Sequence, residues 1–146
     1  MGLSSIILDG MADILETAGV GTYDPAAPPA TATETPVIVC GRLPTQPDRA
    51  VALSAYPVAL DPILPNAEIG VQVRVRGTTA PAVALDLDDA VISALTGLTG
   101  LLFGAVPVSQ IVFRSGSDIG VDSAGRHERV TNWAVYAERS HASLVG

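Results

Sequence analysis

The sequence contains no lysine, one cysteine and two histidines among its 146 residues. With only Cys40, the chain cannot form an intrachain disulfide or a multi-cysteine zinc site. The two histidines, His127 and His141, lack the short spacing of a zinc-binding pair. Aromatic residues make up 4% of the chain, and no apolar run is long enough to cross a bilayer as a helix. These absences argue against a disulfide scaffold, a zinc enzyme and a membrane-spanning protein.

The charge balance is acidic. All eight basic residues are arginine, and 15 Asp and Glu residues bring the net charge to −7. Tight binding to a phosphate backbone needs clustered cations, so the chain is a poor candidate for a nucleic-acid-binding protein. Exclusive use of arginine is typical of GC-rich coding, but it also suits bidentate pairing with carboxylates. Both interpretations stay open.

The periodicity of apolar residues predicts the fold class. Hydrophobic residues make up 48% of the chain, which is long enough for one domain with a single core. Steps of three and four residues predict two amphipathic helices, over 3–18 and 84–102. Strand patterns occur at 37–43, 49–56, 69–76, 108–114 and 129–139. The order α-β-β-β-α-β-β predicts one α+β two-layer domain over residues 1–146. Its sheet should be mostly antiparallel, with both helices on one face. Irregular loops are expected at 19–36, 57–68 and 115–127.

One strand carries the clearest pattern. The segment Ile69–Gly77 reads I-G-V-Q-V-R-V-R-G, with apolar and polar residues in strict alternation. Its valines are predicted to face the core, because successive side chains of a strand point to opposite faces. Gln72, Arg74 and Arg76 should then lie on the other face, with two guanidinium groups in a row. That face meets either solvent or a protein partner.

The densest polar cluster lies at residues 118–128. Its string D-I-G-V-D-S-A-G-R-H-E-R only superficially resembles a calcium loop, because the regular ligand spacing and the closing glutamate are missing. No nucleophile elbow, phosphate-binding glycine loop or paired-carboxylate motif is present. Cys40 is expected to be a small core residue. We therefore expect no catalysis, metal or cofactor, with a small ligand-binding domain or enzyme as the alternative class.

Three segments together resemble the phage minor capsid protein family, which is similar in layout to tail terminators. They are P-D-R-A-V-A-L-S-A-Y-P at Pro47–Pro57, G-V-Q-V-R-V-R-G at Gly70–Gly77 and I-G-V-D-S-A-G-R-H-E-R-V-T-N-W at Ile119–Trp133. The resemblance covers most of the chain. It implies a tail-terminator fold assembled as a ring, expected to be a hexamer, at the head-proximal end of the tail tube.

The resemblance also implies a role and partners. The ring would end tube polymerisation and join the head connector, without catalysis or a cofactor. Its partners would be further copies of the chain, the tail tube protein and a head-completion or connector protein. DNA would pass through the channel without specific binding, and no membrane is involved. The protein would be made in the bacterial cytoplasm and reside in the virion at the head–tail junction. The alternative is a head-completion or minor capsid protein on the portal side.

A cyclic ring needs two different surface patches, one meeting the other on the next subunit. The Arg74/Arg76 face and the acidic loop around Asp118 and Asp122 are expected to supply them. The candidate interface residues are Gln72, Arg74, Arg76, Asp118, Asp122, Arg126 and Arg129. The loops 19–36 and 57–66 are expected to reach neighbouring rings and to order on assembly.

Overall fold

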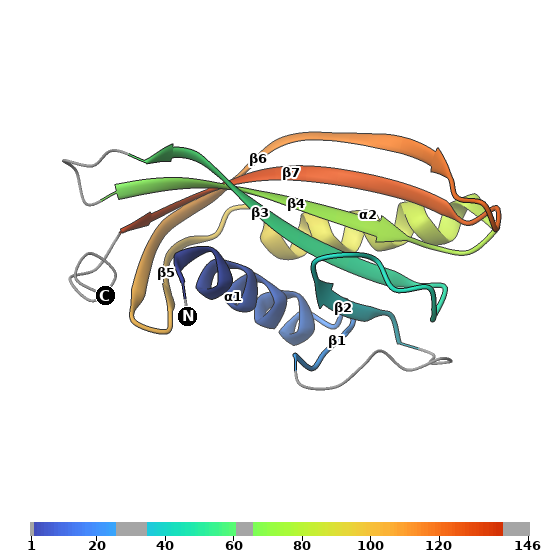
Figure 1. Cartoon of the computed structure of the whole chain (residues 1–146), viewed down its shortest axis with the longest axis horizontal. Coiled ribbons are helices and arrows are strands. Elements are labelled where there is room, and N and C mark those ends of the chain that lie inside the picture. Colours follow the sequence, from blue (N-terminus) through green and yellow to red (C-terminus); the bar gives the residue numbers. More distant parts are fainter. Residues whose placement is uncertain (1, 26–34, 61–65, 139–146) are drawn as a thin grey trace.

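The computed structural model describes residues 2–25, 35–60 and 66–138, and for residues 57–60 it describes the backbone only. Within these residues, two helices and seven strands follow one another, arranged as in Figure 1. They are α1 (Leu3–Thr17), β1 (Thr22–Tyr23), β2 (Val37–Cys40), β3 (Ala50–Leu60), β4 (Asn66–Arg76), α2 (Pro81–Leu95), β5 (Thr99–Phe103), β6 (Val106–Val121) and β7 (His127–Glu138). The predicted α+β class is confirmed.

The strands form one mixed and strongly curled sheet in the order β1-β2-β3-β4-β7-β6-β5 (Figure 1). The pairs β1–β2 and β2–β3 are parallel, and the other four pairs are antiparallel. The prediction of a mostly antiparallel sheet is therefore confirmed. The strand with the clearest alternation, β4, lies in the middle of this order, between β3 and β7.

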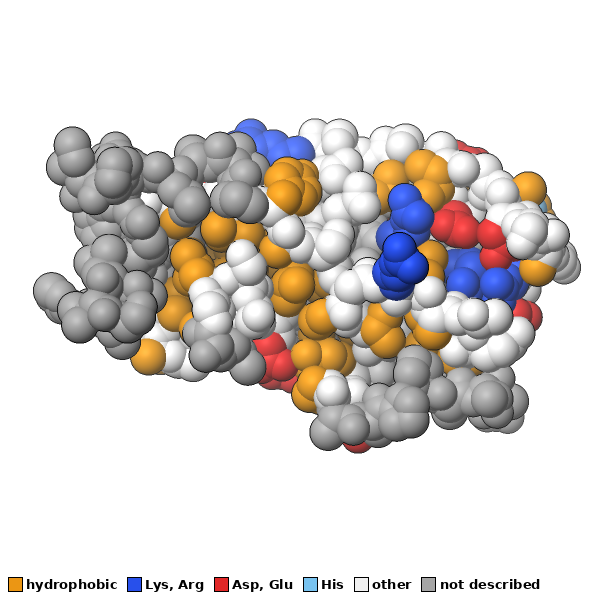
Figure 2. Space-filling view, in the orientation of Figure 1, with side chains coloured by type: hydrophobic (Ala, Val, Ile, Leu, Met, Phe, Trp, Pro, Cys, Tyr) orange, Lys and Arg blue, Asp and Glu red, His pale blue; other side chains and the backbone are white. Residues whose placement is uncertain are grey.

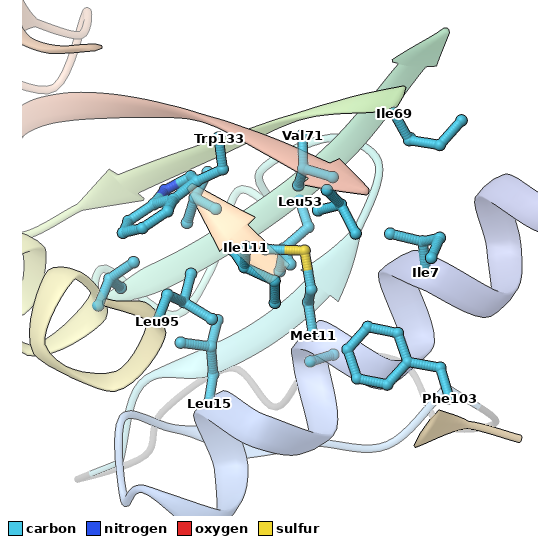
Figure 3. Close-up of a cluster of buried hydrophobic side chains, with 14 of the residues drawn as sticks. Ile7, Met11, Leu15, Leu53, Ile69, Val71, Leu95, Phe103, Ile111 and Trp133 are labelled. Atoms are coloured by element: carbon cyan, nitrogen blue, oxygen red, sulfur yellow. The ribbon is translucent and has the colours of Figure 1, made fainter. Parts of the chain in front are cut away.

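The core lies between the sheet and the two helices, as Figure 3 shows. Ile69, Val71, Val73 and Val75 of β4 are at most 2% exposed, so the face predicted to be buried is buried. Helix α1 adds buried side chains one turn apart, and β7 contributes a buried tryptophan; these are Ile7, Met11, Leu15 and Trp133. Burying one such side chain fully contributes about 1.5–3 kcal/mol, so this shared cluster holds both helices to one face.

The second helix is shorter than predicted. Pro81 stands in its first turn, where its missing N–H leaves no bond unmade, but α2 ends at Leu95. Gly97 and Gly100 adopt positive φ values of 77° and 62°, which end a right-handed helix. Residues 99–102, predicted to belong to the helix, instead lie in strand β5 (Thr99–Phe103), which pairs with β6 as a hairpin.

Two of the predicted loops are largely strand. Within 57–68, β3 continues to Leu60 and β4 begins at Asn66, with Leu60 paired to Ala67. Pro57 is tolerated because none of the described strands lies on the outer side of β3 at this point, and a register shift follows it. Within 115–127, β6 continues to Val121 and β7 begins at His127, so only 122–126 remain as a turn.

The third predicted loop, 19–36, contains a short strand. Thr22 and Tyr23 pair in parallel with Val37 and Ile38, which adds β1 to the edge of the sheet. Residues 26–34 and 139–146, with His141, lie outside the described residues. Across the described ranges, no helix is long and apolar enough to cross a membrane.

Candidate functional site

The sheet face opposite the helices bears a hollow of about 600 Å³, called here the arginine hollow. Its walls come from the loop 41–45 after β2, from β3 and β4, from the turn 122–126 and from Glu128 on β7. Figure 2 shows basic and acidic side chains gathered together on one half of this view. The elements that form the hollow are distant in sequence, so the pairing of β2, β3, β4 and β7 creates it.

Strand alternation places the arginines here. Arg74 and Arg76 occupy the face of β4 opposite its buried valines. In the ladder, Arg74 lies beside Ala52 of β3, and Gln72 lies beside Ser54. Because these β3 side chains are small, the long side chains of β4 border an open space instead of packing against bulky neighbours.

Arg76 holds a loop and is not displayed on the surface. It is 3% exposed, its Nε donates to the carbonyl of Asp48 across 2.9 Å, and its Nη2 donates to the carbonyl of Pro47 across 2.8 Å. Burial, followed by the neighbouring Arg126, lowers the pKa of Arg76. The expectation of two guanidinium groups presented side by side is therefore wrong for Arg76, because the loop before β3 covers it.

Arg126 joins two loops across the hollow. Its Nε donates to Asp122 Oδ2 at 2.8 Å, and its Nη1 donates to the carbonyl of Thr45 at 2.8 Å and to Asp48 Oδ1 at 3.1 Å. The side chain is 11% exposed. This arrangement fixes the β6–β7 turn against the loop before β3.

The two aspartates of the polar cluster hold backbone turns. Asp122 Oδ1 accepts the N–H groups of Arg126 at 2.9 Å and Ala124 at 3.0 Å, and the Arg126 N–H is the main cause that lowers the pKa of Asp122. Asp118 Oδ1 accepts the N–H of Gly120 at 2.7 Å. No group of three His, Cys, Asp or Glu side chains in the described ranges is arranged to hold a metal ion.

Arg74 and Arg42 are the cations of the hollow that remain open to solvent. The Arg74 side chain is 46% exposed, and its Nη1 lies 3.9 Å from Glu128 Oε1, which is a weak pairing. Arg42 is exposed on the wall formed by the loop 41–45. The lining holds four arginines against Asp122 and Glu128, so 4 − 2 gives a net charge of +2 in a chain of −7. The hollow is therefore suited to a carboxylate-bearing partner.

The structure divides the predicted interface residues. Five of them line the arginine hollow, and they are Gln72, Arg74, Arg76, Asp122 and Arg126. Arg129 lies on the helix side of the sheet, where it pairs with Asp88 of α2, and Asp118 lies beyond the hollow on β6. Sequence reasoning missed Arg42 and Glu128. Glu128 belongs to the predicted polar cluster, but only the parallel pairing of β2 with β3 brings Arg42 to the hollow.

A second concave surface was not predicted. Helix α1 and the β5–β6 hairpin border an apolar groove of about 590 Å³, with Leu102 67% exposed in its wall. Asp9 and Asp13 also line this groove, and burial, followed by Asp9 and Glu16, raises the pKa of Asp13.

Cys40, predicted to be a core residue, is exposed instead. It is the last residue of β2, and its Sγ lies 3.7 Å from the hydroxyl of Tyr23. The same hydroxyl donates to Asp9 Oδ1 at 2.8 Å, which ties β1 to α1. Alternation gives Cys40 the same face as the buried Ile38, so its exposure follows from its place at the end of β2, and the sequence alone does not reveal where that strand ends.

Comparison with known proteins supports the same fold. A family model described as bacteriophage tail terminator protein matches residues 14–139, a range that includes every residue lining the arginine hollow. Among solved structures, a chain from the virion of a native gene transfer agent (GTA) particle matches with a TM-score of 0.57 and 20% sequence identity. The match covers 68% of this chain and 78% of that chain, and at this identity it shows the fold alone. A search of curated proteins found no significant match.

Proposed function

The chain belongs to the bacteriophage tail terminator family, and on this basis we propose that its copies form a hexameric ring at the head-proximal end of the tail tube. As a member of this family, the protein is a structural component of the virion tail and not an enzyme. In the proposed role, the ring ends polymerisation of the tube and presents the surface that the head connector binds.

Each subunit of this ring would be one terminator domain over residues 1–146. The support for one domain is the hydrophobic cluster, which takes side chains from both helices and from strands β2 to β7. A single cluster of this kind defines one cooperative unit, because removing an element would expose apolar surface of the others.

The arginine hollow is the observation that carries the proposed partner contact. A net charge of +2 in the lining, with Arg42 and Arg74 open to solvent, contrasts with the −7 of the whole chain. We propose that the hollow receives an acidic surface of an adjacent virion protein: another copy of the chain, the tail tube protein or the connector. Complementary charges of this kind orient partners and speed association more than they add affinity.

The net charge also bears on the DNA that crosses the ring. Six copies at −7 give 6 × −7 = −42. Such a ring repels the phosphate backbone overall, so the genome would pass through the channel without specific binding. A channel wall lined with arginine would contradict this part of the proposal.

Electron microscopy of particles made without the protein tests the proposed role. The expected result is overlong tails of variable length that fail to join heads. Tails of normal length, together with heads that leak DNA, would instead support the alternative role in head completion on the portal side. Particles that are normal in both respects would contradict both roles.

A further inference from the structure

In the described part of the chain, the curled sheet has two long edges with no neighbouring strand, one on each side. On one side, β5 pairs with β6 only as far as Gln110, and one more bond joins Ile111 N–H to Leu98 O. Residues 112–121, called here the β6 edge, have β7 as their one neighbouring strand among the described residues (Figure 1). On the opposite side, β2 reaches Leu53, so residues 54–60, the β3 edge, have β4 alone as a neighbour within the described part of the sheet.

These edges also carry most of the exposed large hydrophobic side chains of the described residues. Six large hydrophobic side chains are exposed in the described part of the chain, and four of them lie on the two edges. Tyr56 belongs to the β3 edge; Phe113, Ile119 and Val121 belong to the β6 edge. A monomeric protein usually covers or shortens such edges, because their unpaired N–H and C=O groups template pairing with another chain. A strand added to such an edge would hydrogen-bond to its unpaired backbone groups and would cover part of its exposed apolar side chains.

We propose that the β6 edge of one copy pairs with the β3 edge of the next, so that the sheets of all subunits join into one continuous wall around the ring. This inference rests on the proposed ring and specifies its joint. The two edges are different surfaces of the same subunit, so each contact is heterologous, which is the kind of contact that closes a ring. Pairing of two β6 edges would use the same surface twice and would stop at a dimer.

The topology also determines the direction of the joint. From β3 through β4 and β7 to β6 there are three antiparallel steps, so β3 and β6 run in opposite directions within one chain. A closed wall of strands requires the strands to be inclined to the ring axis. Rotation about this axis keeps the sense of every strand, and the inclination offsets neighbouring copies along the strands. This offset brings the β6 edge, which the ladders place level with residues 50–56 of its own β3, to residues 54–60 of the next copy. The β6 edge therefore meets the next β3 edge in the antiparallel arrangement, in which ladder hydrogen bonds are perpendicular to the strands.

Ser54 and Ser117 mark the same face on the two sides of the joint. Ser54 lies opposite Gln72 of β4, and Ser117 lies opposite Val130 of β7, which in turn faces Arg74. Both serines therefore occupy the face of the sheet that carries the arginine hollow. Cysteines placed at these two positions would lie on one side of the joint, within reach of a short cross-linking reagent.

Cross-linking tests the joint in purified tail particles and in the isolated protein. The chain first receives Cys40→Ser, and then Ser54→Cys together with Ser117→Cys, before treatment with a short bis-maleimide. The expected product is a ladder of covalent oligomers that ends in a closed ring, while each single-cysteine variant stays monomeric on a denaturing gel. Dimers from Ser117→Cys alone, or no ladder from the double variant, would overturn the proposed joint.

Charge on the edge gives a second, independent test. Ser117→Lys with Ile119→Lys should reduce ring formation by about tenfold or more, because edge lysines block strand pairing. Thermal unfolding of the monomer should stay unchanged, and the matched control, Ala82→Lys with Leu85→Lys on the exposed side of α2, should assemble normally. Normal rings from the edge variant would overturn the joint but leave the ring itself intact. If the wild-type protein itself forms no ring in assembled tails, the proposed function is overturned instead of the joint.

Discussion

Arg129 on β7 donates from Nε to Asp88 Oδ2 on α2 across 3.0 Å, and the other carboxylate oxygen of Asp88 is buried without a hydrogen-bond partner. Asp88 is only 3% exposed, whereas the Arg129 side chain is 27% exposed. A carboxylate buried in this way depends on its guanidinium partner, because little else in its surroundings compensates for lost hydration. The pair therefore links α2 to the sheet, and the loss of Arg129 would leave Asp88 as a buried, unpaired charge.

Arg129→Met should lower the free energy of unfolding by about 2–4 kcal/mol at neutral pH, because it leaves a buried charge unpaired. Denaturant titration followed by far-UV circular dichroism measures this change. The double variant Arg129→Met with Asp88→Leu removes both charges and should recover most of the loss. If the single variant unfolds like the wild type, the pair contributes nothing to the attachment of α2.

Asp88 and Asp122 should impose opposite pH dependences on stability. Burial raises the pKa of Asp88, and Arg129 offsets this only in part, so the folded protein holds the Asp88 proton more tightly than the unfolded chain. Its contribution to the free energy of unfolding therefore falls as pH rises above the ordinary value of 3.8. The stability of the wild type relative to Asp88→Asn should decrease from acid to neutral pH.

For Asp122, the N–H groups of Arg126 and Ala124 and the guanidinium of Arg126 lower the pKa. The stabilisation is complete above the ordinary value of 3.8 and is lost as pH falls through the lower pKa of the folded state. The stability of the wild type relative to Asp122→Asn should therefore increase with pH. Unfolding curves of the three proteins over the same pH series measure both slopes, and slopes of equal sign would contradict the assignment.

Gly10 of α1 lies directly beneath the buried ring of Phe103, so a Cβ at this position would overlap with ring atoms. Gly10→Ala should destabilise the protein by about 1–3 kcal/mol through overpacking. This occurs even though alanine favours a helix by about 1 kcal/mol over glycine. Thermal and denaturant unfolding measure the change, with Gly10→Ala/Phe103→Leu as the control in which a smaller side chain relieves the overlap. A stabilised Gly10→Ala protein would show that Phe103 moves aside freely.

Arg74→Glu should leave the folded monomer within about 0.5 kcal/mol of the wild type, because the side chain is half exposed and only weakly paired. Association with the acidic partner should weaken about tenfold, or about 1.4 kcal/mol. Incorporation of the variant into tails measures this effect. Ala82→Glu with Leu85→Glu makes the same change of net charge on α2 and serves as the control. Equal incorporation of all three proteins would exclude the arginine hollow as the contact.

Arg76→Met should behave differently from Arg74→Met. Arg76 is buried and donates to the carbonyls of Pro47 and Asp48, so its loss should cost about 2–3 kcal/mol of stability. Arg74→Met should be close to neutral. Denaturant unfolding of both variants separates a folding role from a surface role, and equal stabilities would contradict the distinction.

The sequence by itself determined the features that depend on local periodicity. The alternation of β4 identifies the buried valine face, and steps of three and four residues identify both helices, because these patterns follow from backbone geometry alone. The α+β class and the tail-terminator resemblance follow from the order of these elements and three short motifs.

Tertiary structure alone decided where the outer strands end and which charges remain exposed. Segments rich in glycine, serine and aspartate at 115–121, and a proline at 57, look like loops, but neighbouring strands supply the hydrogen bonds that make them extended. Arg74 and Arg76 are indistinguishable by alternation. One is open to solvent and the other is buried, because carbonyls from the loop before β3, distant in sequence, close over Arg76. Local periodicity carries no information about such distant partners.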